Sequence, residues 1–271
     1  MIPIVLALVF LGPNWLFTLA VAGVALLAAW EYLSLAERGG ANPPRIALLV
    51  AILGLFVAIV CAENFEWLHQ TEAVFGILSL GLLVYCTFFK PVEEMMAAAA
   101  TAVFGLLYVG STLSAVPLLR EQTNGPSLVT FLFCAVWAGD IVALYVGRSL
   151  GRHKLAPQLS PNKTWEGALG SVLGSLIATM GLLGLAHLLA TKWNLVWLSY
   201  PEDTWYWLGL AILVNVAAQV GDLAESALKR SAGVKDSGTL IPGHGGVLDR
   251  IDALLLAAPV LWYAQLIHLR F

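Results

Sequence analysis

The sequence predicts an all-α fold, a polytopic membrane bundle of about nine transmembrane helices. Hydrophobic residues make up 59% of the 271 residues, whereas charged residues make up only 11%. The mean hydropathy of +0.83 is typical of chains that fold in lipid rather than in water. Long apolar runs recur from one end of the chain to the other, as successive membrane-spanning helices require.

Short polar or Gly- and Pro-containing stretches separate the expected spans. Gly12, Pro13 and Asn14 interrupt the first run well before the ~20 residues that cross a bilayer, so a short, tilted or re-entrant helix is expected there. It has neither a basic leader nor a cleavage motif, which indicates a retained membrane segment. In chain order the expected spans are 2–12, 14–36, 46–62, 73–89, 95–118, 126–148, 164–191, 205–229 and 248–269.

Loop charge orients these spans. The loops near 149–163 and 229–247 are basic, whereas the loop between them carries Lys192 against Glu202 and Asp203. Because Lys and Arg accumulate on the cytoplasmic side, both basic loops are expected there, with the N-terminus inside and the C-terminus outside. An interfacial aromatic belt is expected around the outer loop, at Trp193, Trp197, Tyr200, Trp205, Tyr206 and Trp207.

Charge and cysteine content exclude some classes of protein. The formal net charge of −3 offers no basic excess for neutralising a phosphate backbone, so a nucleic-acid-binding protein is not expected. Cys61, Cys86 and Cys134 lie far apart inside apolar runs and are expected to be small buried hydrophobes, with no disulfide framework. Small residues within 164–191 predict close packing of another helix against Gly167, Gly170, Ser171, Gly174 and Ser175.

Ionisable residues gather at the facing ends of the last two spans. Asp222 and Glu225 are three residues apart, and Lys229 follows four residues later, so one helix face carries all three. The last span opens with Asp249 and Asp252 at the same spacing. Charged side chains at membrane depth are costly and generally face a bundle interior or a wet cavity. Each is therefore a candidate for function.

The segment between these acids suits a metal-bound polyphosphate. Grouped carboxylates without Cys or paired His ligands suit hard cations, and Mg²⁺ is often held by a few carboxylates plus substrate phosphates. Glycine lets the backbone approach phosphate oxygens, and nearby Lys and Arg supply positive charge. The glycines are Gly238, Gly243, Gly245 and Gly246, and the cations are Lys229, Arg230, Lys235 and Arg250. The alternative is a solvated, charged cytoplasmic turn. His244 lacks a second His or Cys nearby, so hydrogen bonding to phosphate or a structural role is expected.

A second polar group lies between residues 137 and 167. Asp140 sits within an apolar span that ends in a basic stretch beginning at Arg148. Lys163 lies beside the expected start of the next helix, where free N–H groups and the helix dipole favour an anion. The positive-inside rule is the alternative explanation for the basic residues. With no linker or repeat, one membrane domain of residues 1–271 is expected, with 1–125 of uncertain role and 126–271 carrying the chemistry.

Two blocks of sequence resemble the phosphatidate cytidylyltransferase family. The first is the string SALKR, KDSG, PGHGG and DRID between Ser226 and Asp252. The second combines Asp140, Tyr145, Gly147, Arg148, Gly151, Lys154 and Leu155 with SPNKTWEG at residues 160–167. Together they cover the C-terminal half, and a looser hydropathy match that includes AWEY at residues 29–32 extends into the N-terminal half.

The resemblance implies a Mg²⁺-dependent enzyme of the bacterial inner membrane that joins CTP to phosphatidic acid at the cytoplasmic face. The products are CDP-diacylglycerol, a phospholipid precursor, and pyrophosphate. A monovalent cation, a homodimer, surrounding membrane lipids and no nucleic-acid partner are also expected. The implied catalytic residues are Asp222, Lys229, Arg230, Asp249 and Asp252, and the implied metal ligands are Asp222, Asp249, Glu225 and Asp252. The implied substrate-binding residues are Lys163, Arg148, Ser160, Lys235, Asp236, His244, Gly245, Gly246 and Arg250.

Two other functions are compatible with part of the sequence pattern. A CTP-dependent lipid kinase, such as a polyprenol kinase, shares part of the motif but would release CDP. An ion-coupled transporter would run its path through Asp140, Asp222, Glu225, Asp249 and Asp252, but such acids usually lie near the midplane in repeat-related halves. Here they gather at the ends of two consecutive spans. The D-G-x-x-A-R run of CDP-alcohol phosphotransferases is absent.

Overall fold

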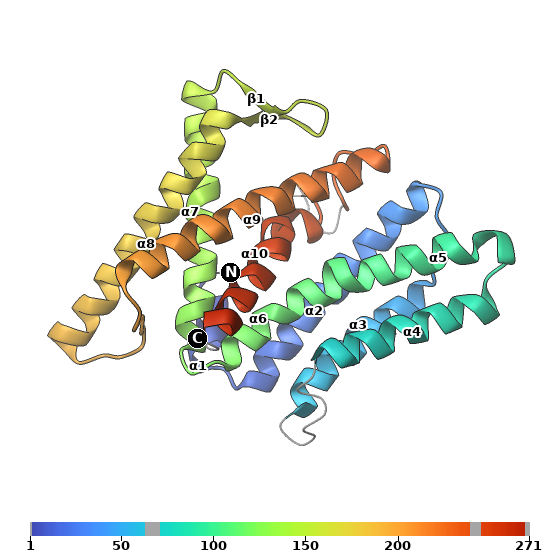
Figure 1. Ribbon diagram of the computed structural model, residues 1–271, viewed down its shortest axis with the longest axis horizontal. Coiled ribbons are helices and arrows are strands. Elements are labelled where there is room, and N and C mark those ends of the chain that lie inside the picture. The colour runs from blue at the N-terminus through green and yellow to red at the C-terminus, as the bar shows by residue number, and fades with distance from the viewer. Residues whose placement is uncertain (1, 63–70, 239–244, 269–271) are drawn as a thin grey trace. The chain divides into compact units, whose positions relative to one another are not determined.

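The computed structural model describes residues 2–62, 71–238 and 245–268, and most of them are helical (Figure 1). The expected all-α class is confirmed. In chain order the elements are α1 (Ile2–Leu11), α2 (Asn14–Arg38), α3 (Arg45–Cys61), α4 (Thr71–Phe89), α5 (Val92–Gly105), the π-helical segment η3 (Leu106–Ser111), α6 (Thr112–Glu121), α7 (Gly125–Leu150), β1 (Lys154–Ala156), β2 (Ser160–Thr164), α8 (Trp165–Trp193), α9 (Thr204–Ser231) and α10 (Leu248–His268).

Helix length revises the expected number of spans. Among the described residues, seven helices are long and apolar enough to cross a membrane, with α5, η3 and α6 counted as one helix from Val92 to Glu121. Helices α1 and α3, which were expected to be spans, have only 10 and 17 residues. Proline limits both, since Pro13 separates α1 from α2 and Pro44 precedes α3. The polytopic architecture holds, with seven rather than about nine candidate spans.

The chain divides into two compact units. Unit 1 contains Met1–Gly12, Leu119–Ser226 and Asp252–Phe271, and unit 2 contains Pro13–Leu118 and Ala227–Ile251. Helices α9 and α10 each contribute residues to both units. The expected single membrane domain, with its division near residue 125, stays a prediction.

In unit 1, small residues let α7 and α8 pack closely side by side. A Cβ atom on Gly170 would lie 2.8 Å from Cβ of Val146, and one on Gly174 would lie 2.8 Å from the carbonyl oxygen of Ala138. Neither helix could therefore approach so closely with larger residues at these positions. The packing role predicted for this stripe is confirmed, and it brings the polar residues of α7 and α8 to one place.

A β-hairpin joins α7 to α8, although the sequence predicted only a loop there. Strand β1 pairs antiparallel with β2, with Lys154 opposite Thr164 and Ala156 opposite Ser160. The Thr164 hydroxyl caps α8 by accepting a hydrogen bond from the Gly167 N–H at 3.1 Å. Lys163 therefore lies on a strand directly before the helix start.

Unit 2 fixes α2 against its neighbouring helices. The Tyr32 hydroxyl donates a hydrogen bond to the carbonyl oxygen of Thr101 on α5, at 2.9 Å. Gly105 makes room for this ring, because a Cβ there would lie 2.6 Å from Cε1 of Tyr32 and 2.7 Å from Cδ2 of Leu48. This packing fixes the rotation of α2 and therefore the direction in which the neighbouring Glu31 points.

Candidate functional site

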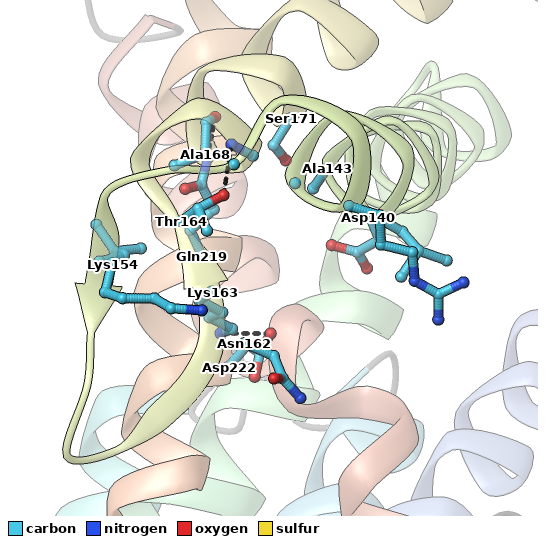
Figure 2. A pocket seen from close by; sticks show the side chains of 16 residues that line it. Asp140, Ala143, Lys154, Asn162, Lys163, Thr164, Ala168, Ser171, Gln219 and Asp222 are labelled. Carbon is cyan, nitrogen blue, oxygen red and sulfur yellow. Dashed lines mark hydrogen bonds and ion pairs between the residues drawn. The ribbon is translucent and has the colours of Figure 1, made fainter.

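A cavity of about 600 Å³ lies in unit 1, between α7, the hairpin, α8 and α9 (Figure 2). Its wall combines apolar and charged residues. The ionisable and amide side chains that line it are Asp140, Arg148, Lys154, Asn162, Lys163, Gln219 and Asp222. A cavity with both cations and carboxylates can hold an anionic ligand together with its counterion.

Lys163 and Asp222 form an ion pair at this cavity. The ammonium nitrogen lies 2.5 Å from Oδ2 of Asp222, and both side chains are partly exposed. Figure 2 shows the pair joining β2 to α9. An incoming phosphate competes with the carboxylate for Lys163, and an incoming cation competes with the ammonium group for Asp222. Two residues predicted from separate motifs are therefore brought together.

Asp140 lines the same cavity from α7. The sequence identified it as an acid within an apolar span and part of the family-like block, but it was not among the predicted metal ligands. Its position opposite the α9 side of the cavity adds a second carboxylate to that of Asp222 (Figure 2). Oxygen ligands from two different helices are a common way of holding a hard divalent cation.

A ladder of hydrogen bonds supports the cavity. The Gln219 amide donates to the carbonyl oxygen of Ala168 at 3.2 Å and to Oδ1 of Asn215 at 2.7 Å. Asn215, which is 1% exposed, donates in turn to the hydroxyls of Ser171 at 2.9 Å and Ser175 at 2.7 Å. These bonds satisfy buried polar groups and fix α9 against α8, so that Gln219 faces the cavity from a set position.

The acids at the adjoining ends of α9 and α10 were predicted as metal ligands. A Cβ on Gly221 would lie 2.6 Å from the carbonyl oxygen of Asp252, so the two helices touch beside Asp222. Glu225, one turn further along α9, is 0% exposed. Within 2–62, 71–238 and 245–268, no group of three or more His, Cys, Asp or Glu side chains is arranged to hold a metal ion. The metal-ligand assignment stays a prediction.

Asp249 belongs to unit 2, where it contacts Lys229 and the glycine-rich segment. Its Oδ1 lies 2.6 Å from the Lys229 ammonium, and these side chains are 11% and 13% exposed. Its Oδ2 accepts hydrogen bonds from the Ser237 N–H at 3.0 Å, the Ser237 hydroxyl at 2.9 Å and the Gly246 N–H at 2.8 Å. The Gly246 N–H, predicted to face phosphate, is directed at this carboxylate instead.

Glu31 on α2 is a site residue that the sequence reasoning did not select. It is 3% exposed and accepts hydrogen bonds from the Val247 N–H at 3.0 Å, the Leu248 N–H at 2.8 Å and the Ser237 hydroxyl at 3.0 Å. The available signal was an acid inside an apolar helix, the same signal that identified Asp140.

The remaining predicted residues lie around these two groups. Arg148 lines the cavity of unit 1, whereas Ser160 on β2 does not. The Arg230 guanidinium donates to the carbonyl oxygen of Val234 at 3.0 Å, beyond the end of α9. Lys235, Asp236 and Arg250 have exposed side chains. Gly245 has a positive φ of 79°. His244 lies outside the described residues.

Glu166 anchors the hairpin that carries Lys154 and Lys163. Its carboxylate accepts hydrogen bonds from the backbone N–H groups of Arg152 at 3.1 Å and His153 at 3.2 Å. The same carboxylate lies 2.6 Å from Nδ1 of His153. Because the Glu166 carboxylate holds both ends of the hairpin together, Lys154 and Lys163 keep their positions at the cavity wall.

Comparisons with known proteins identify the family of this chain. Residues 1–268 match the model of the cytidylyltransferase family. A phosphatidate cytidylyltransferase of Synechocystis sp. is 35% identical over 97% of this chain and 92% of its own length. One of Staphylococcus saprophyticus is 30% identical over 79% of this chain and 76% of its own length.

The phosphatidate cytidylyltransferase of Brucella abortus is 42% identical over 69% of this chain. The match spans 65% of that relative's own length. The predicted family resemblance, drawn from the two motif blocks, is confirmed by these matches. The chain belongs to the cytidylyltransferase family.

Proposed function

We propose that this protein transfers the cytidylyl group of CTP to phosphatidic acid and releases pyrophosphate. The observation that carries the proposal is the cavity of unit 1, where the cations of Arg148, Lys154 and Lys163 share a wall with two carboxylates. Such a cavity suits a phosphate monoester and its counterion. Family membership and the names of the relatives give this ligand its chemical class.

In this reaction the protein mainly aligns the two substrates and neutralises the charge of their phosphates. An oxygen of the phosphatidate phosphate attacks the α-phosphorus of CTP, the bond from that phosphorus to the bridging oxygen breaks, and pyrophosphate leaves. The phosphate monoester is already anionic, so no strong base is needed. Lys163 and Arg148 orient the lipid phosphate, and Lys163 leaves Asp222 to do so.

A divalent ion fits the acids at this site. Asp140 and Asp222 offer carboxylate oxygens, the ligand type that Mg²⁺ prefers, and neither Cys nor paired His competes. When bound, Mg²⁺ would neutralise charge on the triphosphate and the leaving pyrophosphate. We propose Asp222 as its main ligand, with Asp249, Asp252 and Glu225 as the other carboxylates. A monovalent cation is the remaining proposed cofactor.

We assign the triphosphate of CTP to the residues of unit 2 around Asp249. Lys229, Arg230, Lys235 and Arg250 supply the charge, and the other proposed contacts are Asp236, His244, Gly245 and Gly246, where a CTP phosphate would take the Gly246 N–H from Asp249. Lys229 is already held by Asp249, which fixes its direction before CTP arrives. The acyl chains of phosphatidate remain in the bilayer beside the apolar helices. The basic loops face the cytoplasm of a bacterial inner membrane, where CTP is available, and a homodimer is the proposed assembly.

The test is a product analysis with purified, detergent-solubilised protein, Mg²⁺, phosphatidic acid and CTP labelled separately in the base and in the γ-phosphate. We expect base label in the lipid and γ-label in pyrophosphate. Base label that stays in water as CDP, with γ-label in a lipid alcohol, would identify a kinase instead. Folded protein without metal-dependent chemistry would favour an ion-coupled transporter.

A further inference from the structure

A single buried carboxylate holds both ends of the glycine-rich segment, defined here as residues 235–248. Ser237 lies before residues 239–244, and Val247 and Leu248 lie after them, yet all three donate hydrogen bonds to Glu31. Glu31 belongs to α2, far away in sequence. Asp249, directly after the segment, also joins Ser237 to Gly246, and Glu31 adds a second connection that comes from the N-terminal half of the chain.

The contacts of Glu31 also cap α10. The first N–H groups of a helix lack partners within that helix, and a negative charge there is favoured by the helix dipole. The Leu248 N–H, at the first residue of α10, lies 2.8 Å from Oε2 of Glu31, and Leu248 is fully buried. Removing the carboxylate would leave buried donors without an acceptor, which destabilises this position of the helix start.

Two of the described glycines that flank residues 239–244 lie directly against the Glu31 side chain. A Cβ on Gly238 would lie 2.5 Å from Oε1 of Glu31, and one on Gly246 would lie 2.6 Å from its Cδ. Any other residue at these positions would displace either the carboxylate or the backbone from this contact. At these two positions, the close approach expected of glycine is an approach to Glu31.

Ser237 connects Glu31 to the predicted catalytic residues. Its hydroxyl lies 3.0 Å from Oε2 of Glu31 and 2.9 Å from Oδ2 of Asp249, and Asp249 pairs with Lys229. The hydroxyl is within hydrogen-bonding distance of both carboxylates and donates its single proton to one of them at a time. Glu31, Ser237 and Asp249 therefore form a continuous chain of contacts. A displacement of Glu31 therefore reaches the ammonium group of Lys229 through Ser237 and Asp249.

We infer that Glu31 is a positioning residue for the CTP half of the reaction. It acts through Ser237, Asp249 and Lys229 and contacts neither substrate. The inference rests on the proposed function for the identity of the nucleotide. It gives the N-terminal helices a role, because Glu31 on α2 binds the segment that connects α9 to α10 in the chain.

The experiment compares E31A and E31Q with E37Q in the steady-state kinetics of CTP and of phosphatidate. Glu37 lies on the same helix, is partly exposed and pairs with Arg45, so it controls for loss of a carboxylate from α2. We expect E31A to raise the KM for CTP by about 10- to 100-fold, the range of a lost charge-assisted hydrogen-bond set. The KM for phosphatidate should change less than about twofold, and E37Q should match the wild type.

E31Q keeps an acceptor oxygen, so it should recover part of the CTP affinity. If E31A does not fold, the kinetics of E31Q and S237A test the inference instead. Each of these variants should raise the KM for CTP more than the KM for phosphatidate. Equal increases in both KM values, or a lowered melting temperature with both KM values unchanged, would overturn the inference.

Binding of Mg²⁺ and CTP without phosphatidate separates this inference from the proposed reaction. Weaker CTP binding by E31A than by the wild type supports the inference even if the wild type transfers to another acceptor. Equal dissociation constants in the wild type and E31A overturn it, and so does a wild type that does not bind CTP. Failure to form CDP-diacylglycerol would by contrast count against the proposed function alone.

Discussion

The ammonium nitrogen of Lys163 on β2 lies 2.5 Å from Oδ2 of Asp222 on α9, at the wall of the unit 1 cavity. The pair places one positive and one negative charge in a space that also contains Asp140 and Arg148. Each partner is available to a ligand of opposite sign once the other is displaced. Under the proposed function, a phosphate and a cation that enter together would each take one partner of this pair.

Replacing Lys163 by Met should weaken the use of phosphatidate. The variant loses a charge-assisted contact to the lipid phosphate, so kcat/KM for phosphatidate should fall by about 10- to 100-fold while the KM for CTP changes little. Kinetics at varied phosphatidate in mixed micelles measure this. Lys192→Met, in the last turn of α8, is the matched control. Unchanged values for both substrates would remove Lys163 from the site.

Replacing Asp222 by Asn should lower turnover by about 100-fold or more, because a neutral amide holds a divalent cation poorly. The same variant should need more Mg²⁺ for half-maximal activity. A magnesium titration of wild type and variant measures both effects. An Asp222→Asn enzyme with the wild-type magnesium dependence would show that the ion is held elsewhere.

Chelation should stop the reaction reversibly. Activity should disappear in excess EDTA and return when Mg²⁺ is added, because the proposed ion neutralises charge on the triphosphate and on the leaving pyrophosphate. Parallel activity and thermal-unfolding measurements test this. Full activity after exhaustive chelation would refute the proposed metal requirement.

Asp249 should affect both stability and turnover. It accepts hydrogen bonds from Ser237 and Gly246 and pairs with Lys229, so Asp249→Ala removes a carboxylate from beside a largely buried ammonium group. We expect the alanine variant to lose turnover and about 3–5 kcal/mol of unfolding free energy.

Asp249→Asn is the matched variant, because its side chain has the same shape and retains an acceptor oxygen. It should unfold closer to the wild-type temperature but still lack activity. Thermal unfolding beside product formation separates the two effects. Near-normal turnover of the asparagine variant would contradict a metal or phosphate role for Asp249.

The small-residue stripe of α8 yields a prediction about stability. Gly174→Ala should destabilise the protein by about 1–3 kcal/mol, because the new Cβ would lie 2.8 Å from the Ala138 carbonyl oxygen and force α7 away. Gly181→Ala on the same helix meets nothing within 4 Å and serves as the control. Melting temperatures in detergent compare them. Equal melting temperatures for the two variants would contradict the close packing at Gly174.

The helical part of the fold was predictable because apolar runs with polar ends are local features. The expected span 205–229 became α9, Thr204–Ser231, and 126–148 became α7, Gly125–Leu150. The hairpin was missed because its strands are short and β2 contains Pro161, which weakens the strand pattern. The expected segments 2–12 and 46–62 match α1, Ile2–Leu11, and α3, Arg45–Cys61, which are shorter than the seven candidate spans.

The site was predictable residue by residue but not in its connections. Lys163 and Asp222 were each chosen from their own motif, whereas their pairing depends on how β2 and α9 meet. Glu31 was missed for the same reason, since its partners lie in a segment more than two hundred residues away. Sequence patterns report the chemical type and the local face of a side chain, and only packing determines which distant group it contacts.

The measurement that tests the central claim most directly uses phosphatidate labelled with ¹⁸O in its phosphate, unlabelled CTP and the purified protein. Mass spectrometry follows the label in the lipid and in the aqueous products. Direct attack on the α-phosphorus predicts that all of the ¹⁸O stays in the lipid, which gains the mass of a cytidylyl group, and that pyrophosphate carries none. Label in the released pyrophosphate, or a lipid that does not gain the cytidylyl mass, would contradict the account.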